Sequence, residues 1–237
     1  MDHRDLVRAL VEVRDPEFLF ARQYLASAGV DLVRSPSEAR QYLEARATEG
    51  VPEAKLALSK LLAIGMGGPA DDQRAFQMCK SSVDDGYIPA LAWLAAFYSE
   101  GWGGVQRDLP HAIELLHTAA DDGYAHAAAL LASAYSNGLG VREDNAKAAH
   151  FLAQAAEGGD ANSQLMLGLQ LLKSADARET ATGARWIKAA AEQDLSSAHR
   201  HLADLYEQGT VEFPRNPALA REHHDRASEI EQRLGNL

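Results

Sequence analysis

An internal repeat of 35–37 residues constrains the fold of this chain more than any other feature. Each copy begins with a small residue and carries apolar residues four and eight positions later. Such a stripe occupies one face of a helix of about three turns. The small residues that begin the five copies are Ala54, Ala90, Ala127, Ser163 and Ala198. The repeat therefore predicts five helical units between residues 51 and 227.

A second helix follows in every copy, after a turn that contains glycine in most of them. Each of these second helices has an alanine at the equivalent position of the repeat, namely Ala75, Ala112, Ala148, Ala184 and Ala220. Asp108 and Asp144 are placed to cap two of them at their N-termini. The fourth copy departs from the pattern, because it has Ser174 where the others have glycine. Each unit is thus expected to be a helical hairpin.

The glycine pair in Gly138–Gly140 looks like the start of a phosphate-binding loop. Its counterparts, Gly65–Gly67 and Gly101–Gly103, lie at the same place between two expected helices. A phosphate loop would follow a strand and would occur once rather than in series. These glycines are therefore predicted to form the turns of the hairpins.

One hairpin cannot bury its apolar face alone, so neighbouring hairpins are expected to stack. The predicted fold is an all-α, right-handed α/α superhelical solenoid that forms a single domain over the whole chain. Residues 1–50 would form a divergent N-terminal cap and first hairpin, residues 51–227 the five repeats, and residues 228–237 the end of the C-terminal helix. Helices of the N-terminal part are expected at residues 2–13, 17–28 and 37–48, the last capped by Ser35.

Charge and composition restrict the partners and the location. The chain carries 23 Lys and Arg against 34 Asp and Glu, a formal net charge of −11. This charge would repel a phosphate backbone, so nucleic acid is not expected as a partner, whereas a basic protein surface is acceptable.

The single cysteine, Cys79, is expected to be a buried, inert thiol. With neither a signal-peptide pattern nor a membrane-spanning run, the sequence predicts a cytoplasmic protein without membrane insertion.

The third copy shows the repeat in its most complete form. The residues that carry the pattern in this copy are Ala127, Leu131, Tyr135, Gly138, Gly140, Val141, Asp144, Lys147, Ala148, Ala155, Ala156 and Gly158. This pattern resembles the Sel1-like repeat family, a relative of the tetratricopeptide repeats with a somewhat longer unit. The resemblance implies a scaffold that binds proteins or peptides, often in bacterial signalling, secretion or envelope pathways. Secreted members clamp their hairpins with cysteine pairs, and the lack of these pairs here supports an intracellular protein.

The related tetratricopeptide superhelix binds its partners in a concave groove, which is lined by solvent-facing residues of the first helix of each hairpin. If the equivalent helix positions face the groove in this chain, the groove is lined by these residues: Glu53, Leu56, Lys60, Ala63, Ala92, Ala96, Ser99, Glu100, His126, Ala129, Ser133, Ser136, Asn137, Leu165, Leu169, Leu172, Lys173, Arg200, Asp204, Glu207 and Gln208. We expect an apolar part of the partner to lie over Leu165–Leu172. The alternative is that the fourth hairpin buries these leucines against a longer C-terminal helix.

Trp102 lies in a glycine turn and is a candidate exposed hot spot for partner binding.

No cofactor, metal or catalytic site is expected from the sequence. Histidines gather at His199, His201, His223 and His224, but His199 and His201 diverge on a helix, and the chain has no HExxH or CxxC spacing. The chain is thus expected to be no enzyme but a scaffold or adaptor for a protein or peptide, in a bacterial signalling or secretion pathway. The alternative is an inhibitor or immunity-type protein that occludes a basic toxin or enzyme.

Overall fold

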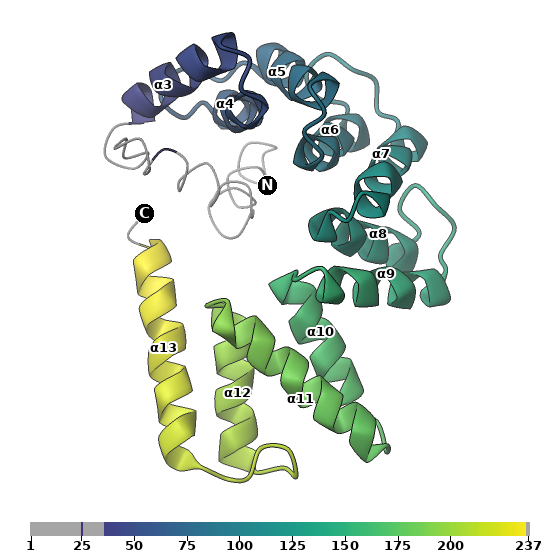
Figure 1. Ribbon diagram of the computed structural model, residues 1–237, viewed down its shortest axis with the longest axis vertical. Helices are drawn as coiled ribbons and strands as arrows, with labels where there is room; N and C mark the ends of the chain where they lie inside the picture. The colour runs from purple at the N-terminus through teal and green to yellow at the C-terminus, as the bar shows by residue number, and fades with distance from the viewer. Residues whose placement is uncertain (1–24, 26–35, 236–237) are drawn as a thin grey trace. The chain divides into compact units, whose positions relative to one another are not determined.

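The computed structural model describes Leu25 and residues 36–235 (Figure 1). Throughout that part the regular structure is helical, without strands. The helices expected at residues 2–13 and 17–28 and the cap at Ser35 lie outside the described residues, apart from Leu25. None of the described helices combines the length and the apolar character that crossing a bilayer requires.

Helix α3 (Pro36–Thr48) precedes five helical hairpins, which confirms the predicted units. We call the first helix of each hairpin the A helix and the second the B helix. The pairs are α4 (Pro52–Ile64) with α5 (Asp72–Asp84), α6 (Pro89–Glu100) with α7 (Leu109–Asp121), α8 (Ala125–Asn137) with α9 (Asn145–Glu157), α10 (Ala161–Leu171) with α11 (Ala177–Glu192), and α12 (Ser196–Gln208) with α13 (Pro217–Gly235).

Aspartates at the N-termini of B helices explain where these helices begin. The carboxylate of Asp71 accepts a hydrogen bond from the backbone N–H of Arg74 at 2.9 Å. Asp108 caps α7 and Asp144 caps α9 in the same way, as the sequence predicted. Each such cap satisfies N–H groups that have no partner within the helix, and is typically worth about 1 kcal/mol.

The chain forms two compact units, Met1–Asp122 and Gly123–Leu237. The first unit has a core that includes Leu58, Leu62 and Phe97. The second has a core in which Ile187 and Leu202 are fully or almost fully buried. Because each unit has its own buried cluster, each is described separately below.

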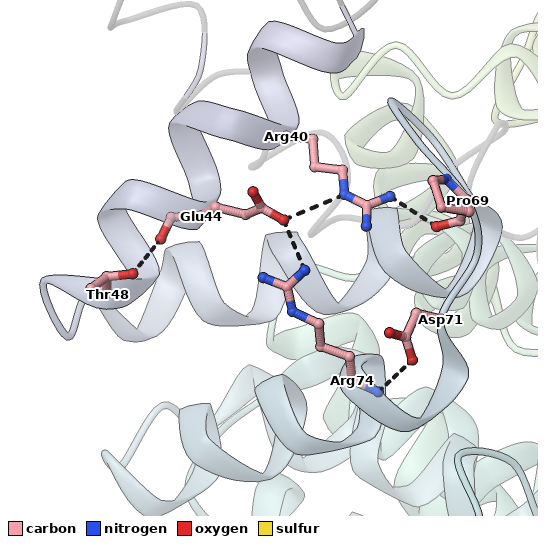
Figure 2. A network of polar contacts seen from close by, with 6 residues as sticks. All are labelled: Arg40, Glu44, Thr48, Pro69, Asp71 and Arg74. Carbon is pink, nitrogen blue, oxygen red and sulfur yellow. Dashed lines mark hydrogen bonds and ion pairs between the residues drawn. The ribbon is translucent and has the colours of Figure 1, made fainter.

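A polar network joins α3 to the first hairpin in the first unit (Figure 2). Glu44 accepts a hydrogen bond from Arg74 Nη1 at 2.9 Å and lies 3.6 Å from Arg40 Nε. Arg40, which is buried, also donates to the carbonyl oxygen of Pro69 at 2.9 Å. Glu44 thus links two arginines, one from its own helix and one from α5.

In the first hairpin the second glycine of the turn packs against α3, and in the second hairpin it packs against α5, the B helix of the preceding repeat. A Cβ atom at Gly67, where φ is +75°, would lie 2.2 Å from the carbonyl oxygen of Pro36. At Gly103, where φ is +66°, it would lie 2.5 Å from the Cβ of Phe76. Only glycine combines this left-handed backbone with so close an approach. The turn glycines of the first unit therefore join one repeat to the next.

The fourth repeat lacks the glycine turn and uses glycine elsewhere. Gly168 of α10 and Gly183 of α11 face each other, so that a Cβ at Gly183 would lie 2.7 Å from the carbonyl oxygen of Gly168. A Cβ at Gly168 would lie 2.6 Å from Cγ1 of Ile187. The two helices therefore pack backbone against backbone, at a distance that no larger residue allows.

Candidate partner-binding faces

In the first unit, the A-helix face that was expected to line a groove is largely buried. Lys60 is 1% exposed and Ala92 is 6% exposed, so the expectation that these side chains face solvent is wrong. Leu56 and Ala63 are buried as well, Ala96 is half-buried, and Glu100 is exposed. In α4 nine of 13 residues are buried and in α6 seven of 12, so most of the surface of these two helices lies in the core.

Lys60 belongs to a buried polar cluster instead. Its ammonium lies 5.1 Å from the centroid of the Trp93 ring, which is close enough for a cation–π interaction. Trp93 donates its indole N–H to the hydroxyl of Ser59 at 3.0 Å, and this hydroxyl donates to the carbonyl oxygen of Ala75 at 2.7 Å. Ser59 and Lys60 therefore hold α4, α5 and α6 together.

Trp102 is not the exposed residue that the sequence suggested. It is half-buried and packs against the core of the first unit. Its ring lies edge-to-face on Phe97, with 6.4 Å between centroids. A tryptophan held in this way contributes first to the packing of its own turn.

In the second unit, α8 and α12 carry their expected residues on the surface. Ser133 and Asn137 of α8 are exposed, and Ala129 is half-buried. Asn137 donates to the backbone carbonyl of Ser133 at 2.8 Å, which fixes its side chain along the helix. On α12, the three predicted residues Arg200, Asp204 and Glu207 are also exposed.

The leucines of α10 face the core. Leu165 is 7% exposed, and Leu169 and Leu172 are half-buried against the same cluster, so the expectation of an apolar groove floor is wrong. The covering residues come from α11, α12 and the loop residue Phe213, whereas the alternative expectation named the C-terminal helix. Met166, one position further along α10, is 61% exposed in their place.

The fifth hairpin brings His199 of α12 next to His223 of α13, and His224 of α13 next to acids of α12. The Nδ1 atoms of His199 and His223 lie 2.9 Å apart between α12 and α13. Burial lowers the pKa of both imidazoles, and the positive charge of Arg226 lowers the pKa of His199 further, although Asp194 opposes this. The buried Nε2 of His199 has no hydrogen-bond partner among the described residues.

Two neighbouring features of this hairpin were missed at the level of sequence. An open pocket of about 760 Å³ lies beside the histidine pair and is lined by charged residues of α13, among them Arg221, Glu222 and Asp225. On the surface, Asp204, Glu207 and His224 place one possible metal-ligand atom each within 4.8 Å of the others. The i, i+3 spacing of the two acids was visible in the sequence, but the register of α13 against α12 was not.

Known proteins are similar to this chain over the repeats described above. A family model of the Sel1 repeat matches residues 52–87, 88–124, 125–160 and 196–230. It passes over the fourth hairpin, which is the one that lacks the glycine turn. A sequence comparison with curated proteins found no match.

Solved structures share the fold. A Sel1 repeat protein from Oxalobacter formigenes is 23% identical, with a TM-score of 0.72 over 98% of this chain and 68% of its own. The protective antigen c5321 of uropathogenic Escherichia coli, described as an SLR fold, is 23% identical, with a TM-score of 0.58 over 99% of this chain and 52% of its own. The immunity protein Pa5087 from Pseudomonas aeruginosa is 16% identical, with a TM-score of 0.62 over 93% of this chain and 83% of its own.

At these identities the likeness concerns the fold, and it confirms the predicted all-α solenoid class. The chain spans about half the length of the antigen and about two thirds of the Oxalobacter protein. The family match covers more than half of the chain and four of its five hairpins. The chain therefore belongs to the Sel1 repeat family.

Proposed function

We propose that the chain is a non-catalytic scaffold that holds a protein or peptide partner on the A helices of its second unit. Sel1 repeat proteins are generally protein-interaction scaffolds. The observation that carries the choice of face is that α8, α10 and α12 each expose side chains, whereas α4 and α6 are buried nearly all round. We call this face the second-unit row and define it as Ser133, Asn137, Met166, Arg200, Asp204 and Glu207.

The chemistry of the second-unit row favours a partner with a mixed surface. Small polar side chains on α8 let a partner approach the helix closely, and Met166 offers a flexible apolar contact. The acids of α12 and the formal net charge of −11 favour a partner with basic residues. In this proposal the chain acts as an adaptor in the cytoplasm of a bacterium, in a signalling or secretion pathway.

The test uses two variants that each place one glutamate at an exposed apolar position. Met166→Glu changes the second-unit row, and Val211→Glu changes a loop residue that is 91% exposed. With the chain as bait in cells of its source, we expect one partner to be captured by the original chain and by Val211→Glu but not by Met166→Glu. Equal capture by all three baits, with equal helicity by circular dichroism, would contradict the proposed face.

An inhibitor of the immunity type is the second candidate. Two observations favour it, namely the acidic charge and the likeness in fold to immunity proteins of Pseudomonas aeruginosa. In this case the partner is a basic toxin or enzyme, and added salt would weaken the complex strongly. Peptide capture by an adaptor would depend less on salt. Measuring the dissociation constant of the captured partner at low and high salt separates the two candidates.

A further inference from the structure

Three possible metal ligands from two helices meet on the surface of the fifth hairpin. Asp204 and Glu207 lie one turn apart on α12, and His224 comes from α13, which packs beside α12. One ligand atom of each lies within 4.8 Å of the other two, and all three residues are exposed. His224 Nε2 is 3.6 Å from Glu207 Oε1.

These separations suit a divalent transition metal. Zn²⁺ binds imidazole nitrogen and carboxylate oxygen at about 2.0–2.2 Å, so two ligand atoms of a tetrahedral site lie about 3.3–3.6 Å apart. The 3.6 Å between His224 and Glu207 already falls at this value, and it is longer than a hydrogen bond. Because the three side chains are exposed, rotamer changes can bring the remaining atoms to the same separation.

Neighbouring charges leave the two carboxylates available. Arg200, one turn before Asp204, donates to Glu231 of α13 at 2.5 Å and so has an acid of its own. Within the described part of the chain, Asp204 has no hydrogen bond or ion pair with another side chain. Among the described residues, neither carboxylate forms an ion pair with a lysine or arginine, so with a neutral imidazole the three residues carry two negative charges.

We propose that Asp204, Glu207 and His224 bind one divalent transition metal ion of the zinc class, which ties α12 to α13. One nitrogen and two oxygen donors suit Zn²⁺, Co²⁺ or Ni²⁺, whereas Ca²⁺ and Mg²⁺ prefer oxygen ligands alone. Three protein ligands leave at least one coordination position open to water. Asp204 and Glu207 also belong to the second-unit row, but metal binding requires only this chain, so it can be measured without the proposed partner.

The test measures metal binding by the purified full-length chain. Titration with Co²⁺ should give the visible absorption of a low-symmetry site at one ion per chain, and Zn²⁺ should displace it. Zn²⁺ should also raise the melting temperature, because it binds the folded chain and ties two helices. Glu207→Gln and His224→Ala should each weaken the binding at least tenfold.

Matched controls come from the same two helices. His201→Ala removes an exposed imidazole of α12, and Glu222→Gln removes an exposed carboxylate of α13; both should bind as the original chain does. The proposal is overturned if the original chain binds no Co²⁺ or Zn²⁺, if the control variants lose binding equally, or if His223→Asn abolishes binding while His224→Ala does not. The last result would place the ion at the pair of buried His199 and half-buried His223. Circular dichroism of each variant separates loss of binding from loss of folding.

Discussion

At the scale of single residues, the side chain of Ser59 stabilises the first unit through its hydrogen bonds. Its hydroxyl is buried between three helices, where it accepts from Trp93 and donates to Ala75. We expect Ser59→Ala to lower the free energy of unfolding by about 1–3 kcal/mol, because the indole N–H would lose its partner in a buried site. Denaturant unfolding measures this change.

The matched control is Ser136→Ala, which removes an exposed hydroxyl of α8. A surface change of this kind should stay within about 0.5 kcal/mol. If both variants unfold at the same denaturant concentration, the hydrogen bonds of Ser59 do not stabilise the unit.

His199 predicts how stability depends on pH. Burial lowers its pKa in the folded chain, although Asp194 opposes the effect, while the unfolded chain takes up this proton near pH 6.5. The unfolded state therefore binds more protons as the pH falls through this range, and the melting temperature should drop between about pH 7 and pH 5. The groups that face the imidazole are His223, Asp194 and Arg226.

His199→Asn should make this drop smaller, since the amide does not titrate and can keep a polar group near His223. His201→Asn, which changes an exposed histidine of the same helix, should leave it as it is. An unchanged pH dependence in His199→Asn would show that the pair His199–His223 does not control acid stability.

At the scale of elements, the contact of α10 with α11 depends on two glycines. Gly168→Ala would gain about 1 kcal/mol from helix propensity, yet its new methyl group would lie 2.6 Å from Ile187. Overpacking of this kind costs about 1–3 kcal/mol, so we expect a net loss of stability. Asn162→Ala, at an exposed position of the same helix, is the control and should not destabilise the chain. Thermal unfolding of both variants tests the prediction.

The attachment of α3 depends on Glu44 (Figure 2). Glu44→Gln keeps the shape but removes the charge that links Arg40 and Arg74, which should loosen α3 by about 1 kcal/mol. Amide hydrogens of α3 should then exchange severalfold faster, while those of α12 should not change. Glu49→Gln, which alters an ion pair with Arg46 at the end of α3, should have little effect. Equal exchange rates in Glu44→Gln and the original chain would contradict this role.

At the scale of the whole chain, the repeats could be predicted from the sequence because each element carries its own local signal. Aspartate caps such as Asp108, turn glycines such as Gly138 and the apolar stripe give the period, the helix ends and the hairpins without knowledge of packing. Which side of each helix faces solvent could not be predicted from these local signals, because it depends on packing. Lys60 was predicted to face solvent from the position of groove residues in the related tetratricopeptide superhelix, but the packing of α4 against α3 and α5 buries it.

Two parts of the candidate site could not be predicted, because they depend on how helices pack. The exposed side of α10 differs by one position from the expected side, since the contact between Gly168 and Gly183 brings α10 close to α11 and Leu165 into the core. His224 joins Asp204 and Glu207 only through the register of α13 against α12. No local pattern in the sequence records that register.

The excess of acids predicts a response to salt. With a formal net charge of −11, the folded chain repels itself, and screening should reduce that repulsion. The surface ion pairs that salt also screens are individually weak. We therefore expect the melting temperature to rise when NaCl increases from about 20 mM to about 300 mM. A fall over this range would mean that the ion pairs outweigh the net repulsion.

The turn glycines have a consequence for how such a chain lengthens in evolution. Gly67 and Gly103 each fit against the helix that comes before their own hairpin, one at Pro36 of α3 and the other at Phe76 of α5. A gene duplication that copies one whole repeat would therefore recreate a working junction at each border without further mutation. The fourth repeat has no such turn, so a copy of it would need compensating changes. Gains and losses of repeats among related genes should accordingly fall in the first two hairpins and spare the fourth.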